Sequence, residues 1–300
     1  MMDWTNGFAR MDWRGAARRS GAFAVAAALL LAAPGCSFLG FDGEEEIAKP
    51  AEGATAQSLF NQAEALTKNG DYRQAIKAYD QVERLHPIST FAKRSMIRSA
   101  YAAYRGGEFD KAILSASRYI DFYPSDDQAP YAQYLIAMSH YDQITDVGRD
   151  QARTKAALQS LRELMNRYPD SSYAREAKIK LELAVDHLAG KEMEVGRYYL
   201  KRGQYIGAIN RFRTVVERYQ TTTHTPEALH RLVEAYLALG VDREAQAAAA
   251  VLGHNFPGSP WYQDSYALLT GRNLKPQADD ESWISQTWTS VSSVVDLDWF

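Results

Sequence analysis

One pattern recurs along most of this 300-residue chain. From Gln57 onward, each unit has a helical stretch, a break that contains glycine, a second helical stretch, and then an aromatic residue or histidine, usually followed by proline. The units end at His86-Pro87, Tyr123-Pro124, Tyr168-Pro169, Tyr219-Gln220 and Phe256-Pro257, at spacings of 37, 45, 51 and 37 residues. A repeat of this kind predicts helical hairpins that stack on their neighbours and bury a continuous core.

The interior of the units indicates how the two helices of a hairpin pair. The glycine of each turn can end the first helix in a left-handed conformation, and the closing proline cannot extend the second helix. A small residue follows each turn and allows close approach of the helices, at Ala75, Ala112, Ala208 and Ala245. Hydroxyl side chains that could cap the next helix follow the unit ends, at Ser89, Ser125, Ser171 and Thr223.

The period and the interior pattern resemble those of tetratricopeptide repeats. The resemblance implies an all-α, right-handed solenoid of about five helical hairpins over residues 56–270. Two departures are expected: a long inner turn at Ile144–Asp150 in unit three, and an extra helix at Tyr173–Ala189 before unit four. Ser259-Pro260-Trp261 predicts one further helix, with proline in its first position, that closes the solenoid.

The N-terminal segment is typical of an export signal. Four arginines precede the apolar run Ala22–Ala33, which is too short to span a bilayer, and Cys36, the only cysteine of the chain, follows it. Leu31–Cys36 resembles the bacterial lipoprotein box, although Ala33 and Pro34 stand where that box prefers leucine and a small residue. We therefore expect residues 1–35 to be a lipoprotein signal peptide and Cys36 to carry the lipid. The alternatives are an ordinary secretory signal cut near Ala33, with Cys36 incidental, and a retained membrane helix.

The ends of the expected mature chain differ from the repeats. Residues 36–55 combine glycine, proline and the acidic run Glu44–Glu46, so they are expected to form a solvated, lipidated tether rather than a cation site. Residues 271–300 form a polar tail with three tryptophans, in which Ile284 and Trp288 fall on one helical face. This tail could dock on a partner, fold back onto its own solenoid, or be disordered.

The sequence offers little support for chemistry. Removal of residues 1–35, which hold four Arg and two Asp, changes the formal net charge from −3 to −5, and this argues against nucleic acid as the main partner. His224 and His230 lack the spacing of a helical metal pair, and Glu182 and Asp186 are typical of a solvated helix face. No nucleophile or phosphate-loop motif occurs, so we expect no enzymatic activity, no cofactor and no metal.

Binding surfaces are the remaining expectation, because helical-hairpin solenoids bind peptides and partner domains in their grooves. In the first half, Tyr79, Phe91, Tyr101 and Tyr104 either line a groove or pack between helices. In the second half, Arg197, Tyr198 and Arg211 fall outside the core positions of the repeat and are candidate partner-binding residues. Arginine and tyrosine are enriched at binding hot spots.

Several strings resemble one family in particular. They are Gly196–Gly203, Ala208–Phe212 and Tyr219–Leu229, together with Asp146–Asp150 followed by Ala152. With the lipobox-like start and five tetratricopeptide-like units, they make residues 36–270 similar to the BamD family, lipoproteins of the outer-membrane β-barrel assembly machinery. The tail from Glu281 lies outside the common pattern.

The resemblance implies a non-enzymatic scaffold held by its lipid in the outer membrane and facing the periplasm. Its C-terminal repeats would dock on a periplasmic domain of the BamA subunit, its N-terminal repeats would help capture unfolded outer-membrane β-barrel proteins, and other Bam lipoproteins would join. Arg211 matches an arginine that the family uses at the BamA contact, with Arg197 and Tyr198 in the same motif region. The alternative function is a generic periplasmic repeat adaptor lipoprotein for cell-envelope division or polysaccharide export; a hydrolase is a third class.

Overall fold

The computed structural model describes residues 53–147 and 149–292, with side chains up to Trp288. The expected signal peptide, Cys36 and most of the tether lie outside these residues. The described part forms helices and no strands. The helices are α1 Ala56–Asn69, α2 Tyr72–Leu85, α3 Thr90–Arg105, α4 Phe109–Phe122, α5 Ala129–Tyr141, α6 Ala152–Arg167, α7 Ser172–Lys201, α8 Tyr205–Arg218, α9 Thr225–Leu239, α10 Asp242–Asn255, α11 Pro260–Thr270 and α12 Trp283–Ser292.

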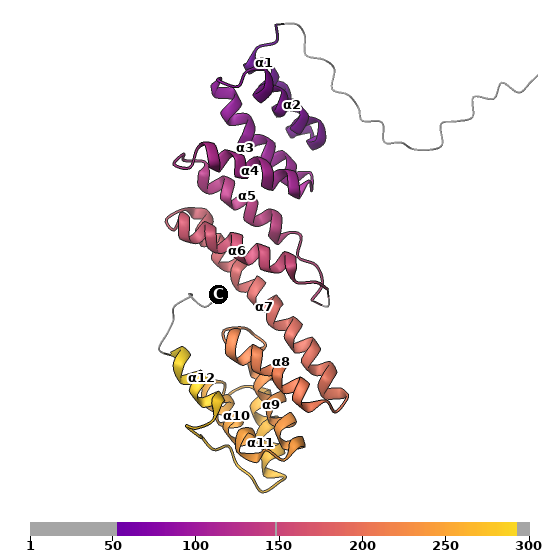
Figure 1. Ribbon diagram of the computed structural model, residues 1–300, viewed down its shortest axis with the longest axis vertical. Coiled ribbons are helices and arrows are strands. Elements are labelled where there is room, and N and C mark those ends of the chain that lie inside the picture. Colours follow the sequence, from indigo (N-terminus) through magenta and orange to yellow (C-terminus); the bar gives the residue numbers. More distant parts are fainter. Residues whose placement is uncertain (1–52, 148, 293–300) are drawn as a thin grey trace, which may run out of the picture. The chain divides into compact units, whose positions relative to one another are not determined.

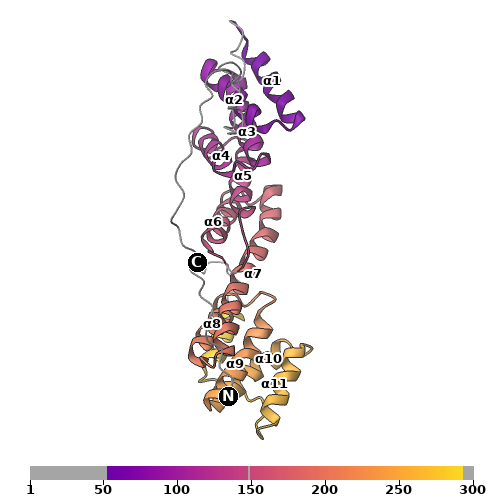
Figure 2. The same cartoon turned by 90° about the vertical axis from the view of Figure 1, so that its right-hand side faces the viewer.

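The first ten helices form five antiparallel hairpins in chain order (Figure 1). Each helix packs on the next, and α1, α3, α5 and α7 also contact one another in succession, as do α9 and α11. The turned view in Figure 2 shows the same succession of hairpins. The predicted all-α solenoid of helical hairpins is therefore confirmed. Among the described residues, no helix is both long enough and apolar enough to pass through a bilayer.

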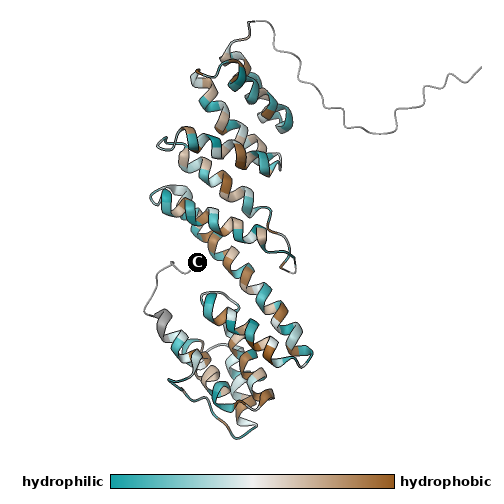
Figure 3. Ribbon diagram, viewed as in Figure 1, coloured by the Kyte–Doolittle hydropathy of each residue, from teal (hydrophilic) through white to brown (hydrophobic). Residues whose placement is uncertain are grey.

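Apolar and small residues build the interfaces between helices. Figure 3 shows hydrophobic residues interspersed with hydrophilic ones along the helices, and this mixture gives each helix a face to bury and a face for solvent. The alanines predicted to permit close approach, Ala75, Ala112, Ala208 and Ala245, are all completely buried. Gly70 and Gly240 end α1 and α9 with φ of 86° and 75°, a left-handed conformation that favours glycine.

Two of the four predicted helix caps are correct. The hydroxyls of Ser89 and Ser171 accept hydrogen bonds from the backbone N–H groups of Ala92 and Ala174, both at 3.1 Å. Ser125 and Thr223 do not cap, because the N-cap positions of α5 and α9 are Gln128 and His224, and a proline occupies the first turn of each helix. The Thr223 hydroxyl instead donates to Asp186 Oδ1 on α7, at 2.8 Å.

The predicted extra helix at Tyr173–Ala189 is not a separate element. These residues are helical, but the helix continues without a break to Lys201, so α7 has 30 residues and also supplies the first helix of hairpin four. Gly190, which follows the predicted end of this helix, does not interrupt α7. A glycine inside a helix costs only about 1 kcal/mol, and contacts of α7 with α5, α6 and α8 outweigh that cost. The long inner turn predicted for unit three is present between α5 and α6.

The C-terminal segment folds back onto the last two hairpins, which was one of three alternatives for it. Ile284 on α12 is completely buried, and α12 packs on α10 and α8. The indole N–H of Trp283 donates to the hydroxyl of Tyr236 on α9, at 2.9 Å. The ring of Trp288 meets that of Phe256 edge-on, with centroids 6.0 Å apart. Residues 283–288 therefore share the hydrophobic core of hairpins four and five.

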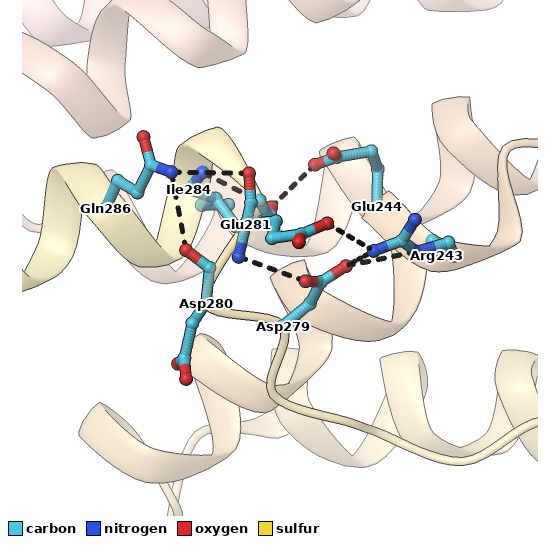
Figure 4. A network of polar contacts seen from close by, with 8 residues as sticks. Arg243, Glu244, Asp279, Asp280, Glu281, Ile284 and Gln286 are labelled. Carbon is cyan, nitrogen blue, oxygen red and sulfur yellow. Dashed lines mark hydrogen bonds and ion pairs between the residues drawn. The ribbon is translucent and has the colours of Figure 1, made fainter.

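Polar contacts hold the segment that precedes α12 against α10 (Figure 4). Arg243 on α10 pairs with Asp279 at 2.8 Å and, more distantly, with Glu281 at 3.5 Å. The hydroxyl of Ser282 donates to Glu244 at 2.7 Å. The Arg243 side chain is largely exposed, so these ion pairs contribute little energy individually. Their effect is to fix the register in which Ile284 enters the core.

Gly196 on α7 is required by the packing of α8. A Cβ atom at this position would lie 2.5 Å from Cε1 of Phe212, whose ring is completely buried. We expect Gly196→Ala to lower the free energy of unfolding by about 1 kcal/mol, because the clash outweighs the higher helix propensity of alanine. Urea denaturation followed by circular dichroism measures this. Gly258→Ala, where a new Cβ would meet nothing within 4 Å, is the control; unchanged or increased stability of Gly196→Ala would contradict the packing argument.

His230 joins α9 to the closing helix α11. Its Nδ1 lies 2.8 Å from the hydroxyl of Ser265, and its ring lies against that of Trp261 with centroids 5.2 Å apart. Burial lowers the pKa of His230, against the opposing effect of Glu234 at 3.7 Å. The folded chain therefore holds fewer protons than the unfolded chain below the ordinary histidine pKa of about 6.5.

We expect the docking of α11 to be strongest above about pH 6.5 and to weaken as the pH falls below it, because His230 must then take up a proton in an apolar site. Amide hydrogen exchange of α11 between pH 7.5 and 5.5, corrected for the intrinsic rate, measures the opening. His230→Gln should flatten this dependence, whereas His254→Gln on the exposed surface of α10 should not. The same pH dependence in His230→Gln would show that another group is responsible.

Candidate partner-binding surface

Arg197 lies on α7 and bridges to α9. Its Nη1 donates to Glu227 Oε2 at 2.9 Å, and Glu227 also accepts from Arg231 at 3.3 Å. The Arg197 side chain is about one-third exposed, at 36%. Removal of Arg197 would take one of two cationic partners from the largely buried carboxylate of Glu227. Arg197 therefore holds α7 and α9 together, and part of its side chain also reaches the surface.

Arg197 also lines an open cavity of about 520 Å³. The inner turn of unit three forms one wall through Asp146 and Val147, and α7 forms another. His224 Nε2 lies 3.5 Å from Asp186 Oδ2, and the backbone N–H of Thr223 donates to the same carboxylate at 3.0 Å. These contacts fasten the start of α9 to the middle of α7.

Tyr198 is the most exposed of the three candidate residues in the second half, at 51%. Its ring meets that of Tyr199 edge-on, with centroids 5.8 Å apart, and the guanidinium of Arg202 lies 4.4 Å from the ring centroid. Tyr199 packs against the core, as its repeat position predicts. An exposed aromatic ring with a cation on its face is a suitable contact for a partner surface.

Arg211 lies on α8 and is 44% exposed. Its Nη1 donates to Glu192 Oε2 on α7 at 3.1 Å. A guanidinium has five N–H donors in a planar fork, and the bond to Glu192 uses one of them. Arg211 can therefore donate to a further carboxylate, supplied by a partner, while Glu192 holds the orientation of the guanidinium.

The three residues do not converge on one site. Arg197 and Glu192, the partner of Arg211, are five positions apart on α7, which is about 140° around a helix with 3.6 residues per turn. Arg197 faces α9, whereas Glu192 faces Arg211 on α8. Arg197 and Arg211 were grouped because they are close in the sequence motif, but the turn of the helix directs their contacts to different neighbours.

In the first half, Tyr79 belongs to the core rather than to a groove. Its ring is completely buried, and its hydroxyl donates to Glu64 Oε1 at 2.6 Å. Arg98 on α3 donates twice to the Glu64 carboxylate, at 2.5 Å each. The hydrogen bond from Arg98 is the main reason that the pKa of Glu64 is lowered, and burial raises the pKa of Tyr79 to about 12. The groove alternative for Tyr79 is therefore wrong.

Phe91 and Tyr101 lie on α3 beside three arginines that the sequence analysis did not identify. The guanidinium of Arg94 lies 4.7 Å from the Phe60 ring centroid and 5.8 Å from that of Phe91. Arg98 and Arg105 lie 5.8 and 5.9 Å from the ring centroid of Tyr101. The spacing of these arginines along the helix, at four and then seven residues, was a signal that could have revealed them.

Tyr104 occupies an intermediate position between core and surface. Its hydroxyl donates to Asp142 Oδ2, just after α5, at 2.6 Å, while its ring contacts the core clusters of the first hairpins. Burial and this hydrogen bond raise the pKa of Tyr104 above its ordinary value. Tyr104 therefore links α3 to the end of α5.

The geometry gives no support for a metal centre in the part of the chain that the structure describes. There, no three or more His, Cys, Asp or Glu residues cluster so that they could hold an ion. His230 is buried against Ser265 and Trp261, and His224 lies beside Asp186. Cys36, the candidate lipidation residue, lies outside the described residues.

Comparisons with known proteins identify a family for most of the chain. The family model described as "Outer membrane lipoprotein" (YfiO) matches residues 52–252, a range that ends within α10 and before the fold-back segment. The chain is 47% identical over 221 residues to the outer membrane protein assembly factor BamD of Caulobacter vibrioides, covering 74% of this chain and 72% of that protein. It is 37% identical to the BamD of Rickettsia prowazekii, covering 72% and 86%.

Among solved structures, the TPR2AB domain of yeast Sti1 is similar with a TM-score of 0.38 and 13% identity, over 79% of this chain and 90% of that one. The family assignment depends on the sequence matches, which extend over most of the hairpins described above. On this evidence, the chain belongs to the outer membrane lipoprotein family that includes the assembly factor BamD.

Proposed function

We propose that this protein is a non-enzymatic lipoprotein scaffold of the β-barrel assembly machinery in the outer membrane. The observation that carries the proposal is the extended match to proteins named outer membrane protein assembly factor BamD. A solenoid of five hairpins supports a scaffold role, because it offers separate surfaces to several partners. Other lipoproteins of the machinery would bind surfaces that BamA and substrates leave open.

Docking on the periplasmic domain of BamA is assigned to the second half of the solenoid, around Arg211. This arginine is exposed, is oriented by Glu192, and keeps donors for a partner carboxylate. Tyr198 would add an exposed aromatic contact from the end of α7. Arg197 would act mainly by holding α9 against α7, and thus by keeping the docking surface in shape.

Capture of unfolded barrel proteins is assigned to a face of α3 that combines exposed arginines with half-buried aromatic rings. There, Arg94, Phe91, Tyr101 and Arg105 alternate cations with aromatic rings. Such a face suits an extended peptide that carries aromatic side chains and a carboxylate, since guanidinium groups pair with carboxylates and rings stack with rings. The pair of Arg98 with Glu64 fixes α3 against α1 beneath this face.

The lipid on Cys36 would hold the solenoid at the periplasmic side of the outer membrane. Each buried methylene contributes about 0.8 kcal/mol to membrane binding, and one acyl chain alone binds only marginally. Several acyl chains on one cysteine would overcome this limit. Cys36 is the only cysteine, so lipidation does not compete with an internal disulfide.

We expect Arg211→Glu to weaken binding to the soluble periplasmic domain of BamA at least tenfold, because it replaces a donor with a like charge opposite the partner carboxylate. Isothermal titration calorimetry measures the affinity, and circular dichroism shows whether the helices persist. Arg175→Glu, an exposed arginine in the first turns of α7, is the matched control and should bind normally.

Glu192→Gln separates the partner contact from the internal ion pair. It removes the carboxylate that orients Arg211 but leaves the guanidinium in place, so its effect should be smaller than that of Arg211→Glu. Normal BamA binding by a folded Arg211→Glu protein would reject Arg211 as a docking residue.

We expect Cys36→Ser to release the protein from washed outer membranes into the soluble fraction, because the thiol that would carry the acyl chains is absent. Fractionation followed by immunoblotting measures this, and mass spectrometry of the N-terminal peptide tests lipidation directly. If Cys36→Ser remains bound but leaves when combined with Arg211→Glu, protein contacts provide most of the attachment. Retention of the double variant in the membrane would contradict both assignments.

A further inference from the structure

A second, larger groove lies on α7 opposite the side that faces α9. It has a volume of about 1060 Å³ and is bounded by α6, the middle of α7 and the end of α8. Its lining residues include Gln151, Lys155, Leu158, Arg162, Arg167 and Leu188, together with Lys191, Glu192, Arg218 and Tyr219. No residue of this groove also lines the cavity beside Arg197.

The length of α7 explains why the groove exists. Both α6 and α8 pack on α7, but they do so at different levels of a helix that has 30 residues. A helix rises 1.5 Å per residue, so 30 residues extend about 45 Å, which is roughly twice the length of the neighbouring helices. The second helices of hairpins three and four, α6 and α8, are therefore set apart along α7 (Figure 1). The groove lies between them.

The groove is basic, although the chain as a whole is slightly acidic with a formal net charge of −3. Its cations are Lys155, Arg162, Arg167, Lys191 and Arg218, and its acids are Glu163 and Glu192. The side chains of Lys155, Arg167 and Arg218 are exposed. A concentration of one sign of charge in a concave site attracts ligands of the opposite sign and raises their rate of association.

The floor of the groove is apolar. Leu158 and Leu188 are buried there, and Tyr219 is partly buried between the core clusters of the two halves. Desolvation lowers the pKa of Arg162, so an incoming carboxylate would meet a cation that has already lost part of its water. An apolar floor between basic walls fits a ligand that carries both aliphatic side chains and negative charge.

We propose that this groove binds an acidic, amphipathic polypeptide segment of a partner protein, with its aliphatic side chains on Leu158 and Leu188 and its carboxylates on the surrounding cations. Guanidinium groups bind carboxylates through two parallel hydrogen bonds, which gives geometric specificity as well as attraction. A polypeptide is favoured over a phosphate group, because the apolar floor would be left without a contact by a small anion.

The inference extends the proposed docking function, on which it partly rests. Glu192 lines the groove and also holds Arg211, so a partner that contacts Arg211 would reach the groove over the same stretch of α7. Binding of a free acidic peptide requires no BamA, however. The groove can therefore be tested whether or not Arg211 proves to be a docking residue.

The test uses the full chain in detergent and a short fluorescein-labelled peptide of glutamate with leucine at every fourth position. Fluorescence anisotropy should show binding that weakens with ionic strength and is at least tenfold weaker for the same peptide with glutamine in place of glutamate. The triple variant Lys155→Gln, Arg167→Gln, Arg218→Gln should lose at least tenfold in affinity. A triple variant of exposed cations elsewhere on α7, Arg175→Gln, Lys178→Gln, Lys201→Gln, loses the same charge and should bind within about twofold of the unchanged chain.

Three outcomes would overturn the proposal. Equal losses in the two triple variants would mean that net charge, not the groove, attracts the peptide. If the peptide fails to bind, while pyrophosphate or phosphatidylglycerol vesicles bind and the groove variant loses that binding, the groove is a phosphate site instead. Unchanged peptide binding by a folded groove variant would reject the site. The two assignments are tested by separate measurements. The effect of Arg211→Glu on BamA binding tests the docking residue, and the effect of the groove variant on peptide binding tests the groove.

Discussion

The continuous helix α7 is the constraint on which the rest of the structure depends. It joins the predicted extra helix at Tyr173–Ala189 to the first helix of hairpin four without a break, although it contains Gly190 and Gly196. Contacts with α5, α6 and α8 hold it helical, and Gly196 allows the buried ring of Phe212 to lie directly against its backbone. The basic groove exists because this helix is longer than its neighbours and separates α6 from α8.

The proposed binding surfaces lie on α3, which precedes this long helix in the chain order, and around α7 and α8. Along one face of α3, exposed arginines alternate with half-buried aromatic rings, which suits the peptide capture that we propose. Around α7 and α8, Arg211 and the basic groove present cations, and we propose that acidic partner segments bind there. The fold-back segment covers the last hairpins through Ile284 and Trp283, so apolar surface at the end of the solenoid is protected in a region that the family model does not cover.

Much of the fold was predictable because its signals are local. The turn glycines, the buried alanines and the closing prolines each act within one hairpin, and the structure places Ala75 and Ala245 as the spacing predicted. The predictions that were wrong depended on more distant contacts. Thr223 binds Asp186 on α7 instead of capping α9, and the predicted extra helix continues into hairpin four because α5, α6 and α8 pack on it.

The sequence by itself determined the number and order of the hairpins, because helix periodicity and turn chemistry are encoded over a few neighbouring residues. It also indicated the family, through the resemblance of longer strings such as Gly196–Gly203, and it fixed the residue types available for binding. Only the tertiary structure decided which of these residues share a surface. Arg197 and Arg211 belong to one motif region but point to different helices, whereas Lys155 and Arg218 lie far apart in sequence and line one groove. The direction of a side chain depends on the turn of its helix and on what packs against it, and neither is contained in a linear motif.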